Sequence, residues 1–346
     1  MWLAKYNTKY VLLAAGAIES AVLISFGAAP QLWMIWVGGA IVGITNAVML
    51  GVGVAAIINR WFRVSTGLVI GICTAFTGFG GMLFTPIGQM IIETSGWRTS
   101  YMTLGAISLI VMVVGVLIFY ANRPEDRGML PYGTAKQAAK LAEAPEEERV
   151  ALCVRPSVAR KSLVFWVLIL FGLLINTVCN INAFFATYVE WYNAQADVVA
   201  GIMVGAFVTG AELTAFNSAG NAIGKLGLGV FSDMSVKVTL FLLCACGLLG
   251  LVFMWQFPNT ILLPIGSVLF GCFIPGTLVV APMVVRTVFG YGASYPVIWG
   301  YVGTSLGLGG AVGSYVWAAV SENLGGFTAV FGIAVVCIIL VLVLGL

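Results

Sequence analysis

Residues 217–233 read NSAGNAIGKLGLGVFSD and place three polar side chains at four-residue intervals in an otherwise apolar stretch. The three are Asn217, Asn221 and Lys225, and they share one face of a helix because residues four apart stack on the same side. Asp233 follows about 12 Å further along the axis. A lysine in this setting either extends to the membrane interface or faces protein and water, because lipid does not solvate an ammonium group.

The composition is that of a polytopic helical membrane protein, all-α in fold class. The chain has 346 residues, of which 61% are hydrophobic and 8% are charged, and 43 are glycine. The cations form no stripe that would bind nucleic acid. Histidine is absent, which removes the imidazole base and histidine metal ligands. The seven cysteines show no CxxC spacing, so we interpret them as small buried hydrophobes and expect no enzyme, cofactor or metal site.

Windows of about twenty apolar residues predict membrane-spanning helices on both sides of a polar linker. The linker is expected at residues 121–162, with a short surface helix near 134–143. Four spans precede the linker and six come after it. The ten windows are 11–29, 33–58, 65–92, 100–120, 163–190, 200–232, 236–256, 260–285, 293–320 and 325–345.

The charges between the spans predict the orientation, because cytoplasmic loops collect lysine and arginine. Of the lysines and arginines in the loops, only Arg98 lies on one side of the membrane. The other side holds both chain ends and the linker, so we expect a multi-pass protein of the cytoplasmic (plasma) membrane with cytoplasmic N- and C-termini. Besides the linker cations, this side carries Lys5, Lys9, Arg60, Arg63, Lys237 and Arg286.

The two halves of the chain repeat each other at a constant offset of 229 residues. The coinciding pairs predict that the third and ninth spans are equivalent and that the gene was duplicated. If each half once had six spans, a first pair would precede residue 1. A misplaced start codon, a truncated gene and a genuine ten-span variant remain open. The pairs are Gly71 and Gly300, Gly78 and Gly307, Gly80 and Gly309, Gly81 and Gly310, Glu93 and Glu322, and Gly96 and Gly325.

Two segments resemble the major facilitator superfamily, in its oxalate/formate antiporter and monocarboxylate transporter branch. They are INRWFRVSTGLVIGICTAFTGFGGMLFTPIGQMIIETSGWRTSYMTLG at 58–105 and RPEDRGMLPYG at 123–133. The resemblance implies the major facilitator fold with two helical bundles and about ten transmembrane helices instead of twelve, the first two being absent. The N-terminal bundle would be 1–120, with equivalents of helices 3–6. The cytoplasmic linker would be 121–162, and the C-terminal bundle 163–346, with equivalents of helices 7–12.

The same resemblance assigns roles to residues of the opening stretch and its surroundings. Gly229, Asp233 and Lys237 match the family's gating motif, whose aspartate is replaced by Ala4 in the first half. Lys225 matches a cation implicated in carboxylate binding. The family's second cation falls near Leu306 here, which favours a monocarboxylate, or no transport at all, over a dicarboxylate held between two cations.

Each polar candidate has a structural alternative. Lys225 binds an anion or extends to the interface, and Asn217 and Asn221 bind substrate or a neighbouring helix. Glu19 and Glu212 are candidates for proton coupling or for structural hydrogen bonding. Pro86 and Pro275 are expected to kink their helices, and the glycines of 78–81 and 307–310 to permit close packing. The remaining candidates for cavity lining are Asn176, Asn180, Tyr301 and Thr304.

The primary hypothesis is a secondary active transporter of small organic anions, mono- or dicarboxylates, working by alternating access as an antiporter or with proton coupling. We expect a monomer whose partners are its substrate and the lipid bilayer, with no nucleic acid. Two alternatives stay open. One is a truncated, non-transporting membrane protein, and the other is an exporter of neutral solutes or drugs.

Overall fold

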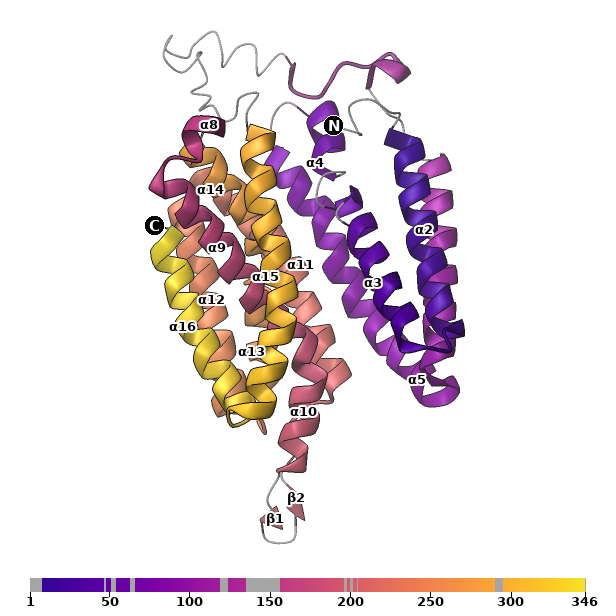
Figure 1. Ribbon diagram of the computed structural model, residues 1–346, viewed down its shortest axis with the longest axis vertical. Coiled ribbons are helices and arrows are strands. Elements are labelled where there is room, and N and C mark those ends of the chain that lie inside the picture. The colour runs from indigo at the N-terminus through magenta and orange to yellow at the C-terminus, as the bar shows by residue number, and fades with distance from the viewer. Residues whose placement is uncertain are drawn as a thin grey trace. The chain divides into compact units, whose positions relative to one another are not determined.

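The computed structural model describes residues 8–46, 48–50, 54–62, 66–118, 124–134, 156–195, 198–199, 202–203, 205–289 and 295–345. This part is nearly all helical (Figure 1). Its one sheet is the antiparallel pair of β1 (Val198–Val199) and β2 (Ile202–Met203). The chain divides into two compact units. Unit 1 is Met1–Thr74 with Pro86–Glu143, and unit 2 is Ala75–Thr85 with Ala144–Leu346.

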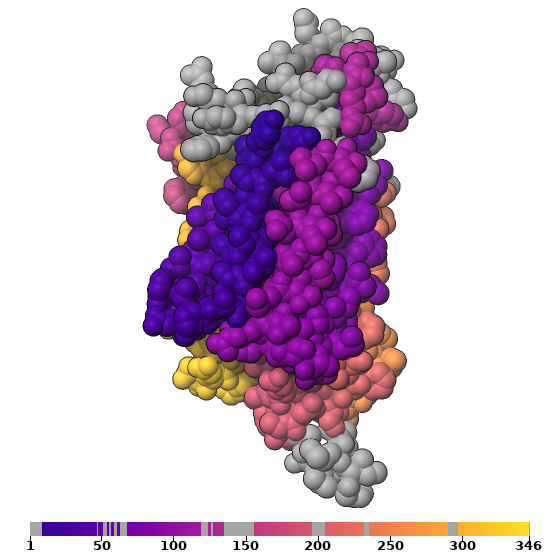
Figure 2. Space-filling model, turned by 90° about the vertical axis from the view of Figure 1, so that its right-hand side faces the viewer, coloured from indigo at the N-terminus to yellow at the C-terminus, as the bar shows by residue number. Residues whose placement is uncertain are grey.

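Unit 1 contains α2 (Thr8–Ala28), α3 (Leu32–Asn46), α4 (Val54–Trp61) and most of α5 (Thr66–Ile118). The second half of α5 runs beside α2, as the magenta and indigo surfaces of Figure 2 show. Ser20 Oγ donates a hydrogen bond to Ser108 Oγ at 3.4 Å across this contact. The start of the linker includes η2 (Pro124–Arg127) and folds back on α4, where Tyr132 N donates to Trp61 O at 2.7 Å.

α5 joins two predicted spans, 65–92 and 100–120, through a break of one residue. That residue is Gly96, with φ 84° and ψ 162°, a conformation that L-residues other than glycine rarely adopt. The Ser100 hydroxyl donates to Gly88 O at 3.2 Å across the break. Pro86 lies inside α5 without departing from helical dihedral angles, so the helix breaks at the glycine and not at the proline.

Unit 2 holds the helices that come after the linker. Three of the predicted spans are less regular than expected. A 3-10 segment interrupts the span predicted at 163–190. In the span predicted at 200–232, α11 begins at Gly210. The span predicted at 260–285 is broken around Pro275, where a kink was predicted. The elements are α8 (Pro156–Ala159), α9 (Leu163–Cys179), η3 (Asn180–Phe184), α10 (Phe185–Ala194), α11 (Gly210–Met234), α12 (Val236–Gln256), α13 (Leu262–Gly271), η4 (Ile274–Gly276), α14 (Val280–Phe289), α15 (Tyr295–Asn323) and α16 (Phe327–Gly345).

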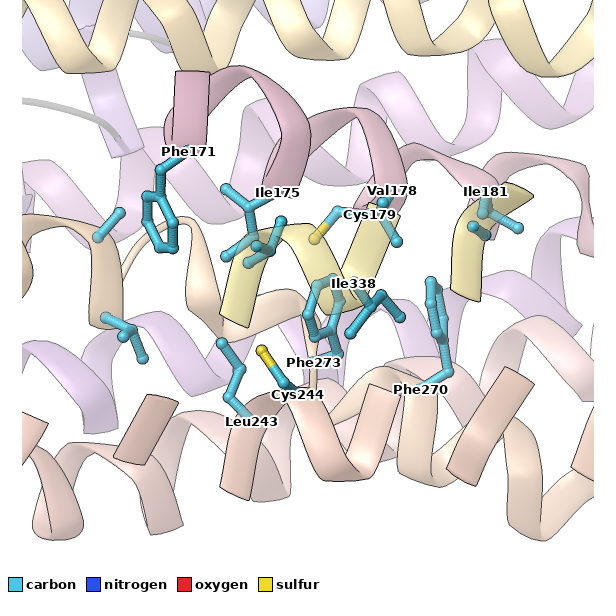
Figure 3. Close-up of a cluster of buried hydrophobic side chains, with 14 of the residues drawn as sticks. Phe171, Ile175, Val178, Cys179, Ile181, Leu243, Cys244, Phe270, Phe273 and Ile338 are labelled. Atoms are coloured by element: carbon cyan, nitrogen blue, oxygen red, sulfur yellow. The ribbon is translucent and has the colours of Figure 1, made fainter. Parts of the chain in front are cut away.

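The core of unit 2 lies where α9, α12, α13 and α16 meet (Figure 3). Phe171, Leu243, Phe273 and Ile338 interdigitate there, and each is completely buried. Lipid tails are as apolar as these side chains, so the hydrophobic effect adds little, and close packing and interhelical hydrogen bonds hold the helices together. One such bond runs from Trp317 Nε1 to Thr177 O at 2.6 Å.

Seven helices of the described part are long and apolar enough to cross a membrane, and one of them, Leu68–Ile118, contains two predicted spans. The long helices α11 and α15 are not among the seven, because glycines and polar side chains lower their hydropathy. Many exposed side chains outside the core are large and apolar, as in a protein surrounded by lipid.

Some predictions need correction or lie outside the described residues. Cys73 is exposed, so its interpretation as a buried hydrophobe is wrong, whereas Cys179 and Cys244 are buried as expected. The surface helix expected at 134–143 and Cys153 lie outside the described residues, except for Thr134.

Candidate functional site

The helix that carries the polar stripe, α11, begins with a capping box. Thr209 Oγ1 accepts a hydrogen bond from Glu212 N at 3.3 Å, and Glu212 Oε2 accepts from Thr209 N at 2.8 Å. This reciprocal pair satisfies two backbone N–H groups that the first helical turn leaves unpaired. The carboxylate of Glu212 therefore has a structural role at the helix end, which favours the structural alternative to proton coupling.

Lys225 is buried inside unit 2. Its side chain is 2% exposed, and its ammonium nitrogen donates a hydrogen bond to Thr77 Oγ1 at 2.5 Å. A lysine that extends to the membrane interface would leave its ammonium group in water or among headgroups. The burial of this side chain therefore favours the alternative in which the ammonium faces protein.

The close approach of segment 75–85 to α11 explains this burial. A Cβ atom at Gly78 would lie 2.6 Å from Ala222 N and 2.6 Å from Ser218 O, so only glycine fits this crossing. A Cβ atom at Gly81 would lie 2.5 Å from Ser218 Oγ. The prediction that these glycines permit close helix packing is confirmed for Gly78 and Gly81. Gly80 has nothing within 4 Å of its Cβ position.

The two asparagines of the stripe have different surroundings. Asn217 is 2% exposed, and its Nδ2 donates to Ser267 O of α13 at 3.1 Å, so it joins neighbouring helices. Asn221 lies one turn before Lys225. Its Oδ1 is buried and accepts no hydrogen bond from the described residues. A buried acceptor without a donor is costly, and such groups in native proteins are few.

Asn176 and Asn180 both contact α15. Asn176 Nδ2 donates to Leu306 O at 2.6 Å, and Asn180 Nδ2 donates to Gly310 O. Thr177 lies between them and donates to Gly309 O at 3.0 Å. These contacts hold α9 against α15, which is the usual role of membrane asparagines.

The other predicted lining residues lie on exposed parts of α15. Thr304 Oγ1 donates to Gly300 O of its own helix at 2.9 Å. Tyr301 packs edge-on against Phe165, and the guanidinium carbon of Arg160 lies 5.7 Å from its ring centroid. Thr304 is thus bonded to its own helix, and Tyr301 contacts the start of α9. These contacts favour structural roles for both residues.

The gating residues lie at the junction of α11 and α12. Gly229 is buried in the last turns of α11, and Lys237 is exposed in the first turn of α12. Asp233 belongs to α11, but its side chain lies outside the described part. Glu19, the other proton-coupling candidate, is half-buried on α2 of unit 1. No group of three or more cysteine, aspartate or glutamate side chains able to hold a metal ion occurs among the described residues.

Sequence reasoning missed Thr77, whose hydroxyl oxygen accepts a hydrogen bond from Lys225. A signal was present, because Thr77 directly precedes the glycine cluster of the internal repeat and lies 229 residues before Leu306. Leu306 is the position at which a second family cation was expected.

The apolar helices indicate a multi-pass membrane protein. Residues 1–285 match the family model described as Major Facilitator Superfamily, which is most of the chain. The protein therefore belongs to the major facilitator superfamily, a family of membrane transporters.

Relatives and solved structures agree with this assignment. "Uncharacterized MFS-type transporter YhjX" of Escherichia coli K12 is 22% identical over 314 residues, 88% of this chain and 70% of that protein. The probable sulfoacetate transporter SauU of Cupriavidus necator is 26% identical over 41% of this chain and 35% of its own. Human monocarboxylate transporter 11 is 24% identical over 35% of this chain and 26% of its own. The chain thus spans well under half of the last two proteins.

The crystal structure of the human organic anion transporter MFSD10 (TETRAN) matches the chain with a TM-score of 0.55. The match covers 98% of this chain and 77% of that one, at 15% identity. At this identity the likeness shows the fold alone, which is the two-bundle fold of the superfamily.

Proposed function

We propose that this protein is a secondary transporter of small organic anions in the cytoplasmic membrane. Lys225 binds the substrate carboxylate, and alternating access of two bundles carries it across, by antiport or with proton coupling. The observation that carries the proposal is a lysine that is 2% exposed in a membrane protein and hydrogen-bonded to a neutral hydroxyl.

The physical reason is electrostatic. A buried ammonium costs free energy because it has lost water. A carboxylate that reaches Lys225 gains a Coulomb attraction that the low local dielectric strengthens. The main contribution to substrate binding is therefore expected at the carboxylate, which is the one charged group of a small organic acid.

The names of the relatives support an anion as substrate. Two of them, monocarboxylate transporter 11 and the probable sulfoacetate transporter SauU, are named for anionic cargo, and MFSD10 is described as an organic anion transporter. The proposal therefore places this chain in the oxalate/formate antiporter and monocarboxylate transporter branch of the superfamily. Leu306, at the position expected for a second cation, is buried and apolar, which favours a monocarboxylate.

The other candidates take secondary places in this proposal. Asn221 contributes a buried amide next to Lys225, and Gly229, Asp233 and Lys237 form the gate at the end of α11. Asn217, Asn176 and Asn180 mainly hold helices together, because their amides donate to neighbouring backbone carbonyls. The protein is proposed to work as a monomer.

Ligand-dependent thermal stabilisation of the purified full-length protein tests the substrate class. A ligand that binds only the folded state at a hundredfold excess over its Kd adds about 2.7 kcal/mol of stability. We expect small monocarboxylates to raise the Tm and their uncharged amides, such as acetamide against acetate, to leave it unchanged. Stabilisation by neutral solutes would support export of uncharged compounds. No stabilisation by any member of the panel would support a non-transporting protein.

A further inference from the structure

A short turn joins α8 to α9 in unit 2, and residues 156–166 are called the α8–α9 elbow here. Three backbone hydrogen bonds fix it: Arg160 N to Pro156 O at 3.1 Å, Lys161 N to Val158 O at 3.0 Å and Ser162 N to Ala159 O at 3.0 Å. Ser162 also caps α9, since its Oγ accepts from Phe165 N at 3.3 Å. The elbow therefore has a defined backbone.

Two cations of the elbow, Arg160 and Lys161, are exposed. Aromatic residues hold Arg160 in place. Trp166 Nε1 donates to Arg160 O at 3.1 Å, and the guanidinium lies over the ring of Tyr301. A guanidinium supported on one face by an aromatic ring keeps its N–H groups directed outward in a planar fork, which matches the oxygens of a phosphate.

The side chains that flank these cations are apolar and exposed. Leu163 is 78% exposed and Trp166 60%, and Val158 and Val164 are also exposed. Leu163 begins a helix that is long and apolar enough, together with its continuation, to cross a membrane. Cations and a tryptophan at the start of such a helix belong at the boundary between acyl chains and headgroups.

We propose that the α8–α9 elbow binds the headgroup of an anionic phospholipid. Arg160 and Lys161 contact the lipid phosphate, and Val158, Leu163 and Trp166 lie along its acyl chains. The charge distribution of the loops predicts that this side faces the cytoplasm, where basic segments beside membrane helices attract anionic lipids. The site is separate from Lys225 and does not depend on which substrate is carried.

The test is a lipid titration of the purified full-length protein in a neutral detergent, with the Tm as the readout. Phosphatidylglycerol should stabilise the wild type at lower concentration than phosphatidylcholine with the same acyl chains. Each basic side chain near an anionic surface raises the binding affinity about fivefold. In the Arg160→Gln/Lys161→Gln variant, the apparent affinity for phosphatidylglycerol should fall about 25-fold. The apparent affinity for phosphatidylcholine should be the same as in the wild type.

Three controls make the outcome decisive. Arg160→Lys/Lys161→Arg keeps both charges and should retain the preference for phosphatidylglycerol. Arg98→Gln removes another cation that lies over an aromatic ring, 4.7 Å from the centroid of Trp97, and should also retain it. Soluble glycerol 3-phosphate should not replace the lipid. Equal stabilisation of the wild type by both lipids would overturn the proposal. So would an unchanged affinity of the Arg160→Gln/Lys161→Gln variant for phosphatidylglycerol, or an equal loss of that affinity in Arg98→Gln.

Discussion

The ammonium nitrogen of Lys225 lies 2.5 Å from the hydroxyl oxygen of Thr77, although 148 positions separate the two residues in the chain. Replacing Thr77 by valine keeps the shape and removes this acceptor. Because a hydrogen bond to a charged group contributes about 1.5–3 kcal/mol, Thr77→Val should lower the Tm, and a bound carboxylate should recover part of the loss. Thr94→Val is the matched control, since its hydroxyl donates to Met90 O of its own helix. An unchanged Tm in Thr77→Val would show that the hydroxyl contributes nothing.

The contact of segment 75–85 with α11 depends on Gly78. In Gly78→Ala the new methyl group meets Ala222 N and Ser218 O at 2.6 Å, and such overpacking costs about 1–3 kcal/mol. Gly80→Ala is its control, because nothing lies within 4 Å of that Cβ position. Thermal unfolding of the two variants should separate them clearly. Equal Tm values would contradict the close crossing.

Two asparagines should respond in opposite ways to the same substitution. Asn176→Leu breaks the bond to Leu306 O and should destabilise the protein by about 0.6–1.7 kcal/mol. Asn221→Leu removes an oxygen that no described residue satisfies, so it should leave the stability unchanged or raise it. If substrate uses the Asn221 amide, the same variant should bind carboxylate less tightly. Denaturation and ligand titration of both variants measure the two effects, and destabilisation of Asn221→Leu as large as that of Asn176→Leu would refute the assignment.

The last paired glycines of the internal repeat, Gly96 and Gly325, both have a positive φ. Gly96 has φ 84° and Gly325 has φ 94°, and neither has a neighbour within 4 Å of its Cβ position. Alanine at either site should therefore cost about 1–3 kcal/mol through the backbone alone. Gly115→Ala, also without such neighbours but at a helical position with no positive φ, should show no such cost. A lower Tm in only one of the two variants, Gly96→Ala or Gly325→Ala, would argue against equivalent turns.

Much of the helical architecture could be predicted from hydropathy, because a membrane span must satisfy its backbone internally and be apolar over about twenty residues. The positive φ angles of Gly96 and Gly325 agree with the equivalence that the repeat predicted. The paired strands at 198–199 and 202–203 and the interruption at 180–184 were missed, since apolar composition does not distinguish a helix from short irregular backbone.

The site was predicted less completely. The polar stripe follows from four-residue spacing, and the burial of Lys225 agrees with one of its two predicted alternatives. The sequence could not indicate that Asn217 faces Ser267 and that Lys225 faces Thr77, because those partners come from distant segments. The domain limits, the gating motif and the proton-coupling carboxylates stay predictions.

The central claim is that a carboxylate binds the buried ammonium of Lys225, and uptake of labelled monocarboxylates into vesicles containing the full-length protein tests it most directly. Wild type should accumulate the anion, and Lys225→Gln should lose at least about 90% of the rate, because a neutral amide forfeits the Coulomb term. Lys225→Arg, which keeps the charge, should retain measurable transport if it folds, and the Tm of each variant verifies folding. Normal uptake by a folded Lys225→Gln variant would contradict the account.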